Sequence, residues 1–157
     1  MSSQPPSTPD AAADNAPQLA LQSVYLKDCS FEAPNGPRVT AEWNPQISLD
    51  LHTSATLVAP DVREVVLTVT VGAKQVDATV FVVEVKQAGL FLMRNLAEPD
   101  AQRAIGSLCP NILFPYARAS VSQLVSQGGF PQLLLPPVNF DALYAQSVTD
   151  AQNTTKQ

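Results

Sequence analysis

Charged residues are scarce in this chain, at 15% of 157 residues, against roughly 25% in typical soluble proteins. A small domain with so few charges has difficulty covering its surface with polar groups, so it is expected either to oligomerise or to expose apolar surface for a purpose. The nine Lys and Arg residues are scattered and the net charge is −5. The absence of a basic cluster excludes the electrostatic footprint that nucleic acid or an anionic membrane requires.

Cysteine and histidine are also rare. Cys29 and Cys109 are too few for a disulfide framework and indicate a reducing compartment. With His52 as the single histidine, no metal-ligand spacing can be assembled, so neither a metal nor another cofactor is expected. The nucleophile, phosphate-binding and dinucleotide-binding motifs are missing as well. These absences predict a protein that is not an enzyme.

The two ends of the chain have little to bury. Residues 1–18 are mostly Pro, Ser, Ala and Asp, so they are expected to form a disordered arm. They lack the positive charge and apolar segment of a signal peptide, and no stretch of about 18 apolar residues exists that could span a membrane. We therefore expect a cytoplasmic protein with one domain at 19–148 and a flexible tail at 149–157.

The first half of the domain has the pattern of β-strands. Residues 19–31 are rich in β-forming residues, and the APNGPR sequence at 33–38 predicts a turn. Ile47, Leu49 and Leu51 then alternate with polar residues, a period of two that is typical of a strand.

Two further strands are expected at 62–71 and 76–87. In the first, Thr68 and Thr70 lie on the face opposite the valines. The short link at 72–75 predicts a hairpin, and short links between strands imply an antiparallel sheet.

The second half has the pattern of helices. A short helix is expected from Pro99 to Cys109, and Pro110 should restart the chain in a second helix that ends at Gly128. A proline-rich linker follows, and Asn139 or Asp141 can cap a last helix. Strands first and helices last predict an α+β fold, a four-stranded antiparallel sheet with C-terminal helices packed on one face.

Three blocks of sequence resemble the signatures of the SecB family of protein-export chaperones. The first is KDCSFEAPN at 27–35, the second is CPNILFPYAR at 109–118, and the third is GFPQL at 129–133 followed by PVNFDALY at 137–144. They occur in the order of the family, and the likeness covers residues 19–146. Three motifs in register are far more specific than one short motif.

The resemblance implies an ATP-independent molecular chaperone without a cofactor. Such a protein binds unfolded precursor proteins in the cytosol, keeps them competent for translocation and delivers them to the motor protein SecA. It further implies a homotetramer, a dimer of dimers, that neither binds nucleic acid nor inserts into the membrane. Unfolded clients are expected to wrap around apolar grooves on its surface.

Two sets of residues are candidates for these contacts. The client-binding groove is expected to include aromatic and aliphatic residues, namely Trp43, Ile47, Leu49, Leu51, Phe114, Tyr116 and Phe140. Core packing is the alternative for all of them. The resemblance places the SecA contact at Asp28, Glu32, Val82 and Glu84. Strand alternation puts Asp28 and Glu32 on one face of their strand, and likewise Val82 and Glu84 on one face of theirs. The alternative is that these residues only form a solvated sheet face that resists edge pairing.

Two other functions are compatible with this composition. The chain could be a structural or scaffold oligomer whose apolar surface is only a subunit interface. An enzyme that acts on a small hydrophobic ligand between sheet and helices is possible on fold grounds alone. An unfolded-client assay separates these alternatives, because only a chaperone keeps a refolding protein soluble without ATP.

Overall fold

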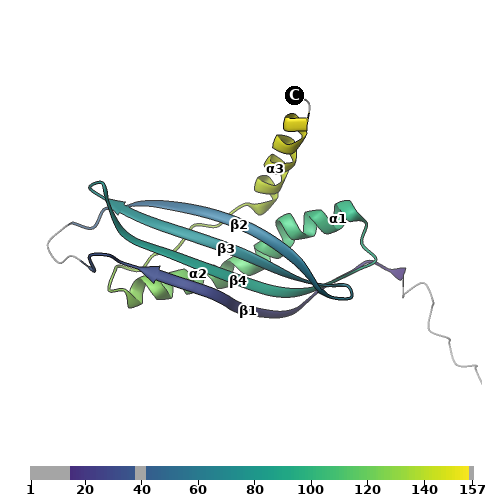
Figure 1. The fold of residues 1–157 in the computed structure, drawn as a ribbon, viewed down its shortest axis with the longest axis horizontal. Coiled ribbons are helices and arrows are strands. Elements are labelled where there is room, and N and C mark those ends of the chain that lie inside the picture. Colours follow the sequence, from purple (N-terminus) through teal and green to yellow (C-terminus); the bar gives the residue numbers. More distant parts are fainter. Residues whose placement is uncertain (1–14, 38–41, 156–157) are drawn as a thin grey trace, which may run out of the picture.

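The first half of the chain forms a four-stranded antiparallel sheet, as predicted (Figure 1). The computed structural model describes residues 15–37 and 42–155. Its strands are β1 (Gln18–Glu32), β2 (Gln46–Ala59), β3 (Val62–Gln75) and β4 (Ala78–Arg94), in the spatial order β1-β4-β3-β2. The helical half consists of α1 (Glu98–Arg103), the π-helical turn η2 (Ala104–Leu108), α2 (Cys109–Gln127) and α3 (Phe140–Thr155). The predicted α+β fold is therefore confirmed.

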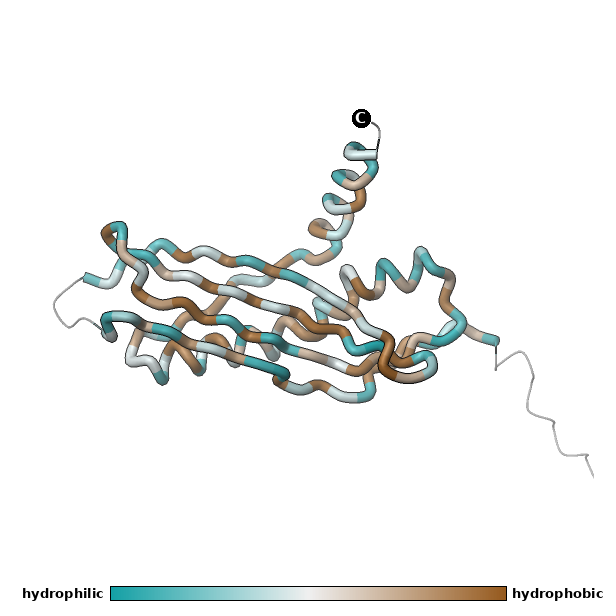
Figure 2. Tube along the Cα trace, viewed as in Figure 1, coloured by the Kyte–Doolittle hydropathy of each residue, from teal (hydrophilic) through white to brown (hydrophobic). Residues whose placement is uncertain are grey.

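Alternation along the strands divides the sheet into an inner and an outer face, and it is visible along β3 and β4 in Figure 2. On the inner face the buried side chains are large and apolar, among them Val69 and Val71 of β3 and Phe81 and Val85 of β4. The outer face carries the intervening residues, including Thr68 and Thr70, which were predicted to lie opposite the valines. Each fully buried valine or phenylalanine contributes roughly 1.5–3 kcal/mol to folding.

Helix α2 covers this inner face. Its buried residues include a stripe that recurs every fourth position, at Cys109, Leu113, Ala117, Val121 and Val125. Residues four apart share one side of a helix, so the stripe packs along β4 and β3. We predicted that the C-terminal helices pack on the sheet, and this is correct for α2 but not for α3. Helix α3 packs instead on η2 and projects away from the sheet (Figure 1).

The hairpin between β3 and β4 is longer than expected. The predicted link at 72–75 is part of the strands, and the turn is Val76-Asp77, where both residues have positive φ angles of 53° and 58°. Two left-handed residues are what a two-residue hairpin turn of the favoured twist requires. Because valine and aspartate are not the usual Asn-Gly pair, the sequence concealed this turn. Strand β4 also extends to Arg94 rather than ending at Gln87.

The predicted break at Pro110 is wrong, because α1, η2 and α2 form one continuous run. Pro110 has no N–H to donate to the preceding turn. The π-helical turn before it is wider, with the N–H of Cys109 bonded to the carbonyl of Ala104, five residues earlier. Pro115 likewise lies inside α2 and not in the first turn of a new helix.

At the C-terminus, the last helix is longer than expected. Asn139 caps α3 as predicted, since its side-chain oxygen accepts a hydrogen bond of 3.0 Å from the N–H of Ala142. The helix then continues to Thr155, so the boundary expected at residue 149 is not present. At the other end, β1 already begins at Gln18, while residues 1–14 of the expected arm lie outside the described residues.

Candidate functional site

Four aromatic rings from distant parts of the sequence meet at one end of the sheet. Phe31 lies near the end of β1, Trp43 precedes β2, Phe81 lies near the start of β4, and Phe130 follows α2. The ring centroids of Phe81 and Phe130 are 5.2 Å apart, and those of Trp43 and Phe130 are 5.6 Å apart. Phe31 stacks on Phe81 at 5.8 Å. These separations are typical of favourable aromatic pairs, so the four rings form one cluster.

Two glycines after α2 allow the chain to close on this cluster. A Cβ atom at Gly128 would lie 2.3 Å from the Phe31 ring, so a side chain there would displace the aromatic ring. Gly129 has a φ of +85° and lies against Pro37, a conformation that costs glycine little. The sequence Gly128-Gly129 thus ends the helix and brings Phe130 to the sheet.

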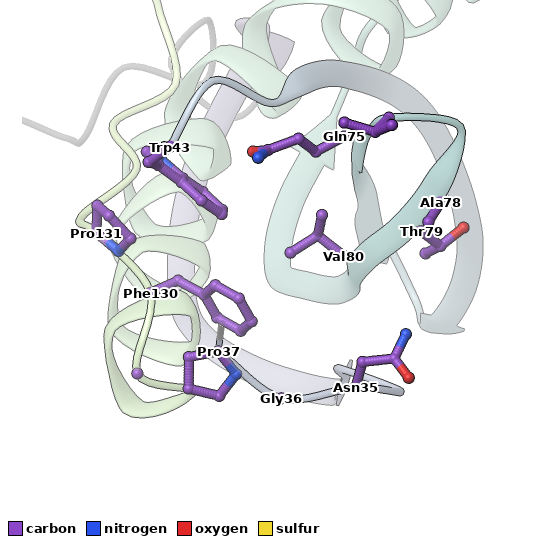
Figure 3. Close-up of a pocket in the computed structure, with 12 residues that line it drawn as sticks. Asn35, Gly36, Pro37, Trp43, Gln75, Ala78, Thr79, Val80, Phe130 and Pro131 are labelled. Carbon is purple, nitrogen blue, oxygen red and sulfur yellow. The ribbon is translucent and has the colours of Figure 1, made fainter. Parts of the chain in front are cut away.

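An open cleft of about 290 Å³ lies beside the cluster (Figure 3). The Trp43 and Phe130 rings border it on one side, and Val80 and the β3–β4 hairpin lie across from them. A β-bulge makes Val80 an additional residue of β4, because Ala73 pairs with Phe81 and Lys74 with Thr79. The cleft is mainly apolar and has a few polar groups, which is typical of a site for an apolar side chain.

The structure places the predicted client-binding residues in different environments. Trp43 lines the cleft and is 39% exposed. Ile47 is exposed, while Leu49 and Leu51 are half-buried against the core on the inner face of β2. Tyr116 is 51% exposed on α2. Of these, only Trp43 borders the cleft.

Two of the predicted groove residues belong to the core instead. Phe114 and Phe140 are each 5% exposed, and their rings meet edge to face with centroids 5.7 Å apart. This pair joins α2 to the start of α3, so neither ring is available to a client in this structure. The alternative of core packing is therefore correct for both.

Sequence reasoning missed the three phenylalanines of the aromatic cluster, Phe31, Phe81 and Phe130, of which Phe130 also lines the cleft. Phe31 and Phe81 reside in strands that are far apart in sequence, and they meet only through the pairing of β1 with β4. A usable signal was present at Phe130, because an aromatic residue directly after two glycines cannot pack within the helix that they end.

The predicted SecA-contact residues do lie together, on the outer face of the sheet. Glu32 of β1 is directly opposite Val82 of β4, and Ser30 is opposite Glu84. Asp28 pairs across the strands with Lys86, a cation that the prediction did not include. The Thr70 hydroxyl donates a hydrogen bond of 3.3 Å to the Glu84 carboxylate. One corner of the outer face therefore carries three carboxylates and an exposed valine.

A second polar cluster lies further along the outer face. The Tyr25 hydroxyl donates to the Glu64 carboxylate, and the Lys27 ammonium lies 2.5 Å from it. Burial, the hydrogen bond to Glu64 and its charge raise the pKa of Tyr25 to about 12. The hydrogen bonds from Lys27 and Tyr25 lower the pKa of Glu64. The three side chains therefore tie β1 to β3 across β4.

The cysteines and the histidine occupy ordinary positions. Cys109 is fully buried, and this burial raises its thiol pKa to about 12, which makes it unreactive. Cys29 is exposed on β1, and His52 is a surface residue of β2. Within residues 15–37 and 42–155, no group of His, Cys, Asp and Glu is arranged to hold a metal ion. In the same part of the chain, no helix is long and apolar enough to cross a membrane.

Comparison with known proteins identifies relatives over nearly the whole chain. The model of the family described as SecB, preprotein translocase subunit SecB, matches residues 12–151. The protein-export protein SecB of Pseudomonas putida is 50% identical over 143 residues, which cover 90% of this chain and 89% of that protein. Its counterpart from Pseudomonas fluorescens is 49% identical over 141 residues, with 89% of each chain covered.

A solved structure has the same fold at low sequence identity. It is the SecB-like chaperone Rv1957 of Mycobacterium tuberculosis in complex with a ChAD peptide from the HigA1 antitoxin. It matches with a TM-score of 0.64 and 16% identity, covering 82% of this chain and 90% of that one. The likeness confirms the architecture of sheet and helices.

Proposed function

Because this chain belongs to the SecB family of protein-export chaperones, we propose that it binds unfolded precursor proteins in the cytosol, keeps them competent for translocation and delivers them to the SecA motor. It does so without ATP or another cofactor and catalyses no reaction. The single observation that carries the proposal is the open aromatic cleft beside Trp43 and Phe130.

The cleft has the properties that a binder of many different chains needs. Trp43 and Phe130 offer flat apolar surface, which accepts side chains of various shapes without reading an exact sequence. A client side chain of Leu or Phe size contributes roughly 1.5–3 kcal/mol when it is fully buried. One such contact is weak, so several along an extended segment give useful affinity while each can still release separately. Folded proteins bury their apolar side chains, so they do not bind to the cleft.

A related fold binds an extended ligand. The mycobacterial SecB-like chaperone was solved with a peptide bound, which supports a peptide-binding role for the same architecture here. The partly exposed inner face of β2, with Ile47, Leu49 and Leu51, lies just after Trp43 in the chain. We include these three residues and Tyr116 in the proposed client surface and leave out Phe114 and Phe140.

We further propose that the working form is a homotetramer, a dimer of dimers. The chain has few charges, and β1 is an edge strand with the exposed apolar residues Leu19, Leu21 and Leu26. Unpaired edges of this kind favour association with another strand. Native mass measurement at micromolar concentration in moderate salt should give four copies, and a monomer would contradict this part of the proposal.

The functional test is suppression of aggregation of a refolding protein in the absence of ATP. The wild type should keep the client soluble, and Trp43→Ala should weaken client binding while the native mass stays that of the wild type. A scaffold oligomer would assemble normally and leave the client to aggregate. If Trp43→Ala binds clients as well as the wild type does, the cleft is not the client site.

A further inference from the structure

Trp43 depends on contacts outside regular secondary structure for its place beside the cleft. It is the single tryptophan of the chain, and it lies in a segment, 42–45, that is neither helix nor strand. Its ring stacks on Phe81 and lies tilted against Phe130, but it remains 39% exposed. Ring contacts of this kind stabilise a structure only weakly, whereas ordering a backbone segment costs conformational entropy at every residue.

The side chain of Gln75, the last residue of β3, holds this segment on both sides of Trp43. The N–H of Asn44 donates a hydrogen bond of 3.1 Å to the Gln75 Oε1 atom. The Gln75 Nε2 group in turn donates a bond of 2.7 Å to the carbonyl of Glu42. One carboxamide therefore binds the backbone of the residue before Trp43 and of the residue after it. Figure 3 shows the Gln75 side chain extending from the hairpin towards Trp43.

We propose that Gln75 is a positioning residue for client binding, which fixes Trp43 in the orientation that forms one wall of the cleft. The inference rests on the proposed function of the cleft. Because the segment around Trp43 is ordered before the client arrives, client binding loses no free energy to ordering it.

The chemistry of the two bonds is specific to a carboxamide of this length. Only an amide side chain offers a donor and an acceptor side by side, as these two backbone groups require. Glutamate at this position accepts from Asn44 but cannot donate to Glu42, and its charge faces a carbonyl oxygen. Asparagine is one methylene shorter. Neither Gln75→Glu nor Gln75→Asn should therefore substitute fully for the wild type.

The test uses Trp43 as its own probe, because no other tryptophan contributes fluorescence. In the client-free tetramer, Gln75→Glu and Gln75→Ala should lower the fluorescence anisotropy of Trp43 and increase its quenching by acrylamide. The dissociation constant for reduced, carboxymethylated lactalbumin, a permanently unfolded protein, should rise about threefold to tenfold, as expected for one or two lost hydrogen bonds. Lys74→Ala, at the neighbouring exposed position, should change neither the Trp43 fluorescence nor the dissociation constant.

A double variant separates positioning from general destabilisation. Adding Gln75→Ala to Trp43→Ala should cause no further loss of client affinity, because Gln75 acts through Trp43. An unchanged Trp43 signal in the Gln75 variants would overturn the inference. So would a loosened Trp43 with unchanged client affinity, provided that Trp43→Ala itself weakens binding. If Trp43→Ala has no effect, the proposed function of the cleft fails first and the positioning role fails with it.

Discussion

Val76 has the most strained backbone position at the rim of the cleft. Its φ angle of 53° lies in the left-handed region, and its side chain is 90% exposed. A residue with a Cβ pays roughly 1–2 kcal/mol in that region, and a β-branched one fits it worst, whereas Asn is tolerated. We predict that Val76→Asn raises the free energy of unfolding by about 1 kcal/mol, since the exposed valine gives up little packing.

Chemical denaturation at one fixed protein concentration measures this gain, because the stability of an oligomer depends on concentration. Asp77→Asn is the matched control. Asp77 has a φ of 58°, but both aspartate and asparagine adopt this conformation readily. An equal midpoint for Val76→Asn and the wild type would show that the turn carries no strain.

The Tyr25–Glu64 contact predicts a pH dependence at both ends of the scale. The pKa of Tyr25 is raised to about 12 in the folded protein, so its contribution to stability is full below the ordinary value of 10 and is lost as the pH rises from about 10 to 12. The pKa of Glu64 is lowered, so its contribution is full above its ordinary value near 4.5 and is lost as the pH falls below that value.

Tyrosinate absorbance measures the alkaline side directly. We expect Tyr25 to give a late titration step, which Tyr25→Phe should remove. In Glu64→Gln the late step should move towards pH 10 without reaching it, because burial is the largest cause of the shift. A wild-type titration curve from which Tyr25→Phe removes no late step would show that Tyr25 does not keep this buried, hydrogen-bonded environment in solution.

At the scale of elements, the seat of α3 on η2 is the least expected feature. The Tyr144 ring rests directly on the backbone of Gly106, where a Cβ would lie 2.3 Å from the ring carbon Cδ2. The Ser107 hydroxyl also donates to the Asp141 carboxylate. We predict that Gly106→Ala displaces α3 and speeds hydrogen exchange at 140–155, while the β3 amides at 65–71 stay protected.

Ser107→Ala is the control, because it removes the hydrogen bond but leaves room for Tyr144, and its effect should be smaller. Alanine is also the better helix former by about 1 kcal/mol, so any loosening of α3 in Gly106→Ala arises despite a gain in helix propensity. Exchange at 140–155 that matches the wild type would mean that Tyr144 does not seat α3.

The elements that the sequence predicted well are those whose pattern is local. The alternation of Val65, Leu67, Val69 and Val71 defines β3 by itself, and the Asn139 cap marks the start of α3. The prediction of a break at Pro110 was wrong because a wider helical turn compensates for the missing N–H of the proline. Local helix propensity does not reveal such a turn.

The candidate site depended on tertiary pairing, so the sequence predicted only part of it. The polar, irregular surroundings of Trp43 are unusual for a core tryptophan and made it a groove candidate, and in the structure it lines the cleft and is partly exposed. Phe114 was a groove candidate with core packing as the alternative, and its ring packs on Phe140 at the start of α3. The ring partners of Trp43 in the aromatic cluster, Phe81 and Phe130, can be placed together only once the strand register and the end of α2 are known.

Across the whole molecule, strand alternation separates the two proposed surfaces. Phe31 and Phe81 point into the aromatic cluster, while their chain neighbours Glu32 and Val82 lie opposite each other on the outer face. Both surfaces are at the same end of the sheet, but on opposite sides of it. If the two proposed roles are correct, we expect substitutions only one residue apart to alter client binding and partner docking independently.

The outer face gives the last prediction, which concerns SecA. The carboxylates of Asp28, Glu32 and Glu84 suit a basic partner segment. Exposed ion pairs are individually worth about 0–1 kcal/mol, but complementary charge steers association and sets register. We predict that Glu84→Gln, or Asp28→Asn with Glu32→Gln, weakens SecA binding. The difference from the wild type should shrink in high salt, where screening already weakens the wild-type complex.

Client holding should survive in the same variants, because the cleft lies on the other face. Glu98→Gln with Asp100→Asn is the matched control, since it removes two exposed charges from α1 and should leave SecA affinity unchanged. SecA affinity and suppression of client aggregation are both measured on each variant. Normal SecA binding by the variant with Asp28→Asn and Glu32→Gln would contradict the proposal that SecA docks on the outer face. A parallel loss of both activities in an intact tetramer would show that the two surfaces are not separate.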